Sequence, residues 1–206
     1  NKGIDVFIDA MNKLRKMKHL AKDVIAFIMV PAWIKGPRED LIQAINGNGN
    51  YKLSQDRCPF VTHELHDPEH DTVMSHLRHL GFCNRQNDRV KVIFVPSYLN
   101  GDDGVFNASY YDLLIGLDLT VFPSYYEPWG YTPHESVAFS VPTVTTTLAG
   151  FGVWAKKNGD KKGIDDGIEV ITRDDYNSDE VSQEIAEIIL DFSLKSVRQI
   201  TFLRDC

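Results

Sequence analysis

The sequence has little that would place the protein in an oxidising compartment or a membrane. Its 206 residues include 3 cysteines, at positions 58, 83 and 206, which are far apart and show no paired spacing. This usage is typical of reduced thiols, so we expect a cytoplasmic protein rather than a disulfide scaffold. No apolar run approaches the roughly 18 residues that a membrane-spanning helix needs, and no signal peptide is visible.

An excess of positive charge is also lacking. Lysine and arginine total 22 against 29 acidic residues, which gives a net charge of −7. This balance argues against a nucleic-acid partner. It also disfavours attraction to anionic membrane surfaces. A phosphate-bearing ligand would therefore need a local positive site.

Two familiar site patterns are missing as well. Histidines crowd one acidic segment, at His63, His66, His70, His76 and His79. Their order includes H-E-L-H rather than the H-E-x-x-H of zinc proteases, in which both imidazoles share one helical face, so no metal site is predicted. The Ala149-Gly150-Phe151-Gly152 segment is expected to be a glycine-rich loop, but it lacks the phosphate-binding pattern of nucleoside triphosphatases.

Apolar runs and helical periodicities alternate along the chain. The predicted strands are 24–30, 90–95, 120–122, 143–145 and 167–172. The predicted helices are 4–18, 37–45, 110–117 and 132–139, with two more beginning at Asp67-Pro68 and at Ser178 as N-cap, and 46–60 is an irregular loop. The alternation predicts an α/β fold in which helices cover both faces of a parallel sheet. The length predicts a single domain, residues 1–206.

The most informative segment begins at Phe122 and ends at Glu135. It is predicted to be the end of a buried strand, a tight turn and the start of a helix, where unpaired N–H groups suit a phosphate. An alternative is an ordinary capping box with Thr132 as N-cap, Pro133 at the first helical position and Glu135 bonded back to the cap. The two interpretations compete for Glu135, because a carboxylate bonded to its own cap is less available to a ligand.

Glu127, Gly130 and Glu135 form E-x2-G-x4-E, which resembles the motif of retaining nucleotide-sugar glycosyltransferases of the GT-B fold. The run YYEPWGYTP at 125–133 resembles more specifically the glycogen synthases of the animal and fungal type. Segments 1–3, 88–94 and 145–152 are similar to the same family, and the resemblance extends to about Ile171. It implies a Rossmann-like donor-binding domain, the carboxyl-terminal half of a GT-B fold, whose amino-terminal domain is not in the chain.

The resemblance also implies roles for individual residues. Lys2 would bind the donor diphosphate, and Glu135 would accept hydrogen bonds from the ribose hydroxyls. Glu127 would contact the glucose hydroxyls near the reacting carbon, with a glycosidase-like nucleophile as the alternative. The family's arginine a few residues before this lysine would precede Asn1, so the cationic pair is incomplete here.

The remaining predicted donor contacts are Tyr110, Trp129, Gly130, Tyr131 and Thr132. Tyr110 matches the family's base-stacking tyrosine, although its neighbour Tyr111 leaves a one-residue ambiguity. The alternative is a tyrosine that packs against the end of a helix.

The implied reaction is transfer of glucose from UDP-glucose, or ADP-glucose, to the 4-hydroxyl of an α-1,4-glucan with retention. The resemblance implies no cofactor and no metal. A sucrose- or trehalose-type transferase and a non-catalytic nucleotide-sugar-binding module are the alternatives, and a homo-oligomer of the full-length protein stays an open expectation. The tail has Lys195, Arg198 and Arg204 where the family has an arginine-rich helix that senses a sugar phosphate, which puts regulation of that type in doubt.

Overall fold

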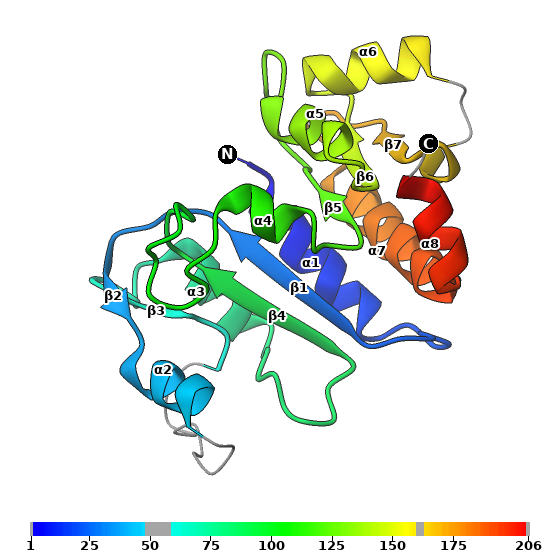
Figure 1. Cartoon of the computed structure of the whole chain (residues 1–206). Coiled ribbons are helices and arrows are strands. Elements are labelled where there is room, and N and C mark those ends of the chain that lie inside the picture. Colours follow the sequence, from blue (N-terminus) through cyan, green and yellow to red (C-terminus); the bar gives the residue numbers. More distant parts are fainter. Residues whose placement is uncertain (1, 48–58, 160–162, 205–206) are drawn as a thin grey trace. The chain divides into compact units, whose positions relative to one another are not determined.

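The computed structural model describes residues 2–47, 59–159 and 163–204. The chain forms two compact units (Figure 1), a larger one of residues 1–23 and 113–206 and a smaller one of residues 24–112. Helix α4 (Tyr110–Leu114) contains the boundary between them. Among the described helices, none has both the length and the apolar character that crossing a membrane requires.

The larger unit is built on a three-stranded parallel sheet. Strands β5 (Thr120–Val121), β6 (Thr143–Thr146) and β7 (Ile168–Ile171) lie in that order. All four residues of the central strand β6 are buried, as expected for a strand covered on both faces. Helix α5 (Tyr131–Ala138) contacts β5 and β6, and α6 (Gly150–Asn158) contacts β6 and β7.

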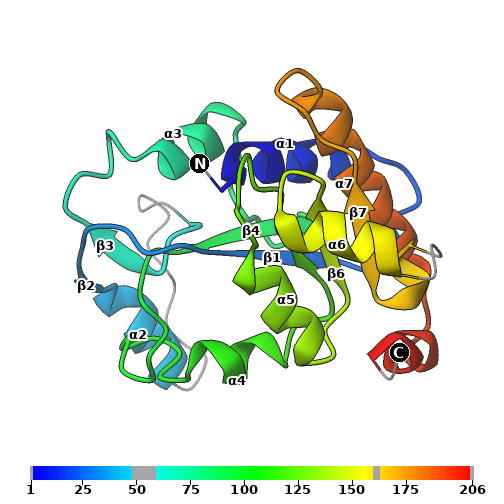
Figure 2. The ribbon, with the colours of Figure 1, turned by 90° about the horizontal axis from the view of Figure 1, so that it is seen from above.

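The first helix of the larger unit packs against a helix far along the sequence. Figures 1 and 2 both show α1 (Ile4–Leu14) beside α7 (Ser178–Leu194). Both helices have buried apolar side chains, among them Met11 and Leu14 on α1 and Ile185 on α7. The short helix η1 (Gly163–Asp166) and the last helix α8 (Val197–Arg204) also contact each other.

The smaller unit contains two strand pairs. Strands β1 (Val24–Met29) and β4 (Val90–Val95) are parallel, with Val24 opposite Val90 and Met29 opposite Val95. Strands β2 (Ile34–Pro37) and β3 (His63–Leu65) are antiparallel. Helices α2 (Glu39–Asn46) and α3 (Thr72–His79) complete the unit.

The α/β fold with parallel strands is confirmed, but several details differ from prediction. The antiparallel pair β2–β3 and helices α6 and α8 were not predicted, and most of the predicted loop 46–60 lies outside the described residues. Helix α3 begins at Thr72 rather than at Asp67-Pro68, because the side chain of Asp71 caps it by accepting from Met74 N at 2.8 Å. Helix α7 includes Ser178, and its N-cap is Asn177.

Candidate functional site

The structure brings together two predicted site residues that are 125 positions apart in the sequence. The ammonium of Lys2 donates to Oε1 of Glu127, and both residues belong to the larger unit. The Glu127 side chain is 19% exposed and that of Lys2 is 63% exposed. A partly buried carboxylate therefore lies against a cation that remains open to solvent.

Backbone pairing holds the loop that bears Glu127. Its N–H donates to Leu148 O at 3.0 Å, and its carbonyl accepts from Gly150 N at 3.1 Å. A Cβ at Gly150 would overlap with the carbonyl of Pro128, so glycine is required for this close approach. The predicted loop 149–152 is therefore wrong from Gly150 onward, where α6 begins with Ala149 as its N-cap.

Helix α5 begins earlier than the capping-box interpretation requires. Its N-cap is Gly130, in the left-handed conformation at φ 91°, so Thr132 is the second helical residue and Pro133 the third. The helix has no side-chain cap, which overturns Thr132 as N-cap and the capping box with it. Within the described residues, the Glu135 carboxylate makes no hydrogen bond back to the start of the helix.

A buried cluster of hydroxyl groups fixes α5 to the strands on either side of it in sequence. Thr120 Oγ1 lies 2.7 Å from Ser136 Oγ and 3.0 Å from Thr143 Oγ1. Thr143 Oγ1 also lies 2.9 Å from Ser136 Oγ. All three residues are buried. Satisfied buried hydroxyls favour one packing arrangement, and here they set the position of the helix that carries Glu135.

An aromatic cluster adjoins the same helix start. Trp129 Nε1 donates to Nδ1 of His134 at 3.4 Å, and the His134 ring stacks on Phe151 at 5.2 Å between centroids. Trp154 also stacks on Phe151, with 5.9 Å between the ring centroids. Tyr131 is 71% exposed and is not in these ring contacts. Of the predicted donor residues, Trp129 therefore packs against other rings, whereas Tyr131 is exposed to solvent.

Tyr110 lies in the smaller unit, where its N–H donates to Leu99 O at 2.8 Å. Its ring meets that of Tyr111 edge to face, with centroids 5.4 Å apart. Tyr110 is half-buried and Tyr111 is exposed. The stacking of Tyr110 on a base stays a prediction.

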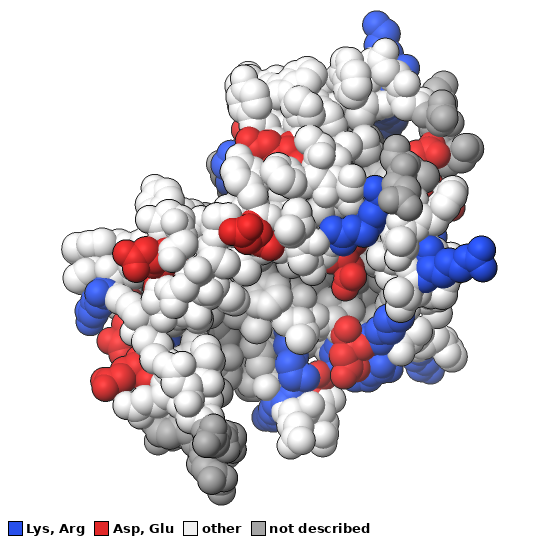
Figure 3. Space-filling model, in the orientation of Figure 1, with Lys and Arg blue, Asp and Glu red and all other residues white. Residues whose placement is uncertain are grey.

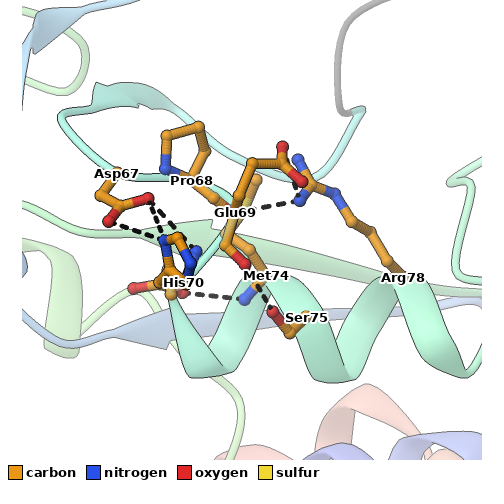
Figure 4. A network of polar contacts seen from close by, with 8 residues as sticks. Asp67, Pro68, Glu69, His70, Met74, Ser75 and Arg78 are labelled. Carbon is orange, nitrogen blue, oxygen red and sulfur yellow. Dashed lines mark hydrogen bonds and ion pairs between the residues drawn. The ribbon is translucent and has the colours of Figure 1, made fainter.

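The histidine-rich segment forms ordinary polar contacts. His63 is buried, and its Nε2 donates to Asp103 O at 2.8 Å. His70 Nδ1 lies 2.9 Å from both carboxylate oxygens of Asp67 (Figure 4), and this hydrogen bond raises the pKa of His70 and lowers that of Asp67. In 2–47, 59–159 and 163–204, no group of three or more histidine, cysteine or acidic residues could hold a metal ion.

Charges of both signs are mixed over the surface. On the face that Figure 3 shows, Lys and Arg are interspersed with Asp and Glu over the described residues rather than gathered in one basic surface. Among the predicted site residues, Lys2 carries a positive charge, and the start of α5 has the partial positive charge of a helix N-terminus.

Sequence reasoning missed three residues, Arg173, Tyr125 and Asp5, that connect the loop before Glu127 to the helix after Lys2. Arg173, which follows β7, donates through Nη1 to the carbonyl of Pro123 and lies over the ring of Tyr125, with 3.8 Å from Cζ to the centroid. The Tyr125 hydroxyl donates to Oδ2 of Asp5 at 3.0 Å. A single arginine after a strand gives little signal by itself; its position at the carboxyl end of a parallel strand was the one available clue.

Comparisons with known proteins give a consistent result. A family model described as glycogen synthase matches residues 50–206. Glycogen [starch] synthase isoform 1 of Saccharomyces cerevisiae is 38% identical over 142 residues, 68% of this chain and 20% of that protein. The Caenorhabditis elegans glycogen [starch] synthase is 39% identical over 151 residues, 71% of this chain and 22% of that protein. The Neurospora crassa glycogen [starch] synthase is 30% identical over 251 aligned residues, 97% of this chain and 35% of that protein.

Proposed function

This chain belongs to the glycogen synthase family, and from that premise we propose that it binds the nucleotide-sugar donor of a glucosyl transfer. The chain spans from 20% to 35% of the length of these three relatives. We propose that residues 1–206 constitute the donor-binding carboxyl-terminal part of a GT-B enzyme, and that an amino-terminal domain supplies the acceptor site. A homo-oligomer of the full-length protein is part of the same proposal.

The observation that carries the proposal is the contact between Lys2 and Glu127 in the unit that also holds the glycine-capped start of α5. We place the diphosphate of the donor at Lys2 and at the first N–H groups of α5. An ammonium and a helix N-terminus both stabilise negative charge on a leaving diphosphate. These groups perform the role that a metal ion has in other transferases, so the proposal includes neither a metal nor a cofactor.

The other donor contacts follow the order of the motif. We propose that Glu135 accepts hydrogen bonds from the ribose hydroxyls and that Glu127 accepts from the glucose hydroxyls. The absence of a capping box among the described contacts of α5 supports this role for Glu135. Trp129, Gly130, Tyr131 and Thr132 would line the diphosphate and ribose.

The proposed reaction is transfer from UDP-glucose to the 4-hydroxyl of an α-1,4-glucan with retention. The bond between glucose C1 and the diphosphate oxygen breaks, and a bond from C1 to the acceptor oxygen forms on the same face. The departing phosphate oxygen takes the proton of the acceptor hydroxyl. In this scheme Glu127 binds and orients glucose and does not form a covalent intermediate, and the 206-residue chain without its amino-terminal partner does not elongate glucan.

A parallel calorimetric titration of the 206-residue chain with UDP and with ADP tests the proposal. We expect UDP to bind more tightly than ADP. Tighter ADP binding would keep the donor site and replace UDP-glucose by ADP-glucose as the proposed donor. If neither nucleotide binds at millimolar concentration, the proposed donor site is wrong for this chain.

A further inference from the structure

Arg173 is a buried cation with an incomplete set of partners. The residue is 3% exposed, and its Nη1 donates to the carbonyl of Pro123. Nε and Nη2 have no hydrogen-bond partner among the described residues. A buried guanidinium with unsatisfied donors costs free energy, so the fold tolerates it only where other contacts compensate.

The guanidinium of Arg173 contacts the loop that leads to Glu127. The guanidinium covers one face of the Tyr125 ring at 3.8 Å, a cation–π geometry. The hydroxyl of Tyr125 donates to Asp5, in the first turn of α1, at 3.0 Å. Tyr125 therefore links Arg173 to the helix that follows Lys2.

A second connection passes through Gly3. This residue has φ 72°, and a Cβ there would overlap with the carbonyl of Pro123 and lie 2.9 Å from Nη1 of Arg173. The turn that carries Lys2 thus packs directly against the carbonyl that Arg173 holds. Two contacts, through Pro123 to Gly3 and through Tyr125 to Asp5, therefore join Arg173 to the segment of residues 2–5 that carries Lys2.

The backbone of Arg173 is itself fixed to the sheet. Its N–H donates to Thr147 Oγ1 at 3.0 Å, and that hydroxyl donates to the Arg173 carbonyl at 3.2 Å. Thr147 follows β6 directly. The backbone of Arg173 is therefore held beside β6, while its guanidinium contacts the loop at Pro123.

We propose that Arg173 is a positioning residue for the transfer reaction. It holds the Lys2–Gly3 turn against the loop of residues 122–127, so that the Lys2 ammonium lies at Glu127 and at the donor diphosphate. Arg173 acts through Lys2 and does not touch the donor. The inference rests on the proposed function, since it assigns Lys2 to the diphosphate.

A double-mutant cycle on UDP binding tests this role. In the otherwise unchanged chain, we expect Lys2→Met to weaken UDP binding by about tenfold, in line with the loss of one charge-assisted contact. In an Arg173→Met background, the same Lys2→Met change should weaken binding by less than about threefold, because the ammonium is no longer held at the phosphate. Arg173→Lys keeps the charge but cannot both donate to the Pro123 carbonyl and cover the Tyr125 ring. In this background, the weakening of UDP binding by Lys2→Met should lie between the other two values.

Arg204→Met is the matched control. Arg204 also donates to carbonyls, to Leu117 O at 2.9 Å and to Ile115 O at 2.6 Å, and neither carbonyl belongs to the Lys2–Gly3 turn or to the loop that bears Glu127. Because Arg204→Met removes only a structural contact, Lys2→Met should still weaken UDP binding about tenfold in this background. If Arg173→Met fails to fold, Tyr125→Phe tests the same connection by removing only the bond to Asp5, and a reduced Lys2 effect is again expected.

The outcomes separate the two proposals. An equal effect of Lys2→Met in all folded backgrounds would overturn the positioning role while leaving the donor site in place. Wild-type binding of UDP with no effect of Lys2→Met would overturn the positioning role and the assignment of Lys2. If UDP does not bind the unchanged chain, the proposed function fails, and the positioning role falls with it.

Discussion

At the scale of the residue, Asp103 shows how a buried carboxylate is stabilised. It is 6% exposed, and its side chain accepts from the N–H groups of Val105, Phe106 and Asn107 at 2.8–2.9 Å. Burial acts to raise its pKa, but these backbone hydrogen bonds together outweigh burial, so the pKa lies below the ordinary value. The ionised form therefore contributes to the free energy of unfolding.

The sign of the pH dependence follows. Because the folded-state pKa is depressed, the contribution of Asp103 is complete above its unfolded pKa of about 3.9 and is lost as the pH falls through the folded-state pKa. We expect Asp103→Asn to lower the free energy of unfolding by about 1–2 kcal/mol at pH 7. Urea titrations at pH 7 and at about pH 3 should show a smaller difference at the lower pH; a difference that does not change with pH would contradict this account.

Single residues also show what sequence can and cannot predict. Glu127, Gly130 and Glu135 could be selected because they lie within one short motif, and the left-handed Gly130 gives that motif a physical basis. The contacts of Arg173 could not be predicted in this way, because its partners Pro123 and Tyr125 are about 50 positions away in sequence. The capping-box pattern was misleading because Gly130 begins the helix before Thr132 could cap it.

At the scale of the element, α7 is held mainly by its contact with α1. Ile185 is fully buried in the larger unit, whereas Leu194 at the end of the same helix is 61% exposed. We expect Ile185→Ala to lower the free energy of unfolding by about 2–5 kcal/mol, through lost burial and the cavity left behind. Leu194→Ala should change it by less than about 0.5 kcal/mol. Urea unfolding measures both, and equal small effects would contradict the α1–α7 packing.

The elements that sequence predicted well are those with a continuous apolar run or a clear helical period. Strand β4 was predicted at its observed limits, and β1 to within one residue. Strands β2 and β3 were missed because both are short, β2 contains Gly36 and Pro37, and each strand depends on the other for pairing. Helix α6 was missed because its glycines resemble a loop; in the structure a Cβ at Gly152 would overlap with the Thr146 carbonyl, so the glycine permits close packing on β6.

At the scale of the whole molecule, the α/β fold and the family match both extend over most of the chain. The two units each contain parallel strands, and the family match extends from residue 50 into the motif and through the last helix. The pattern of alternating strands and helices predicted the α/β class. It did not predict the division into two units, because local periodicity does not specify which strands pair.

The central claim is that the larger unit carries a nucleotide site with Glu135 at the ribose. The most direct measurement is the UDP affinity of the unchanged chain, of Glu135→Ala and of Glu187→Ala, an exposed glutamate of α7 that serves as the matched control. We predict that Glu135→Ala weakens UDP binding by about tenfold or more, as expected for hydrogen bonds to a carboxylate, while Glu187→Ala leaves it unchanged. Equal UDP affinities for all three proteins would contradict the account.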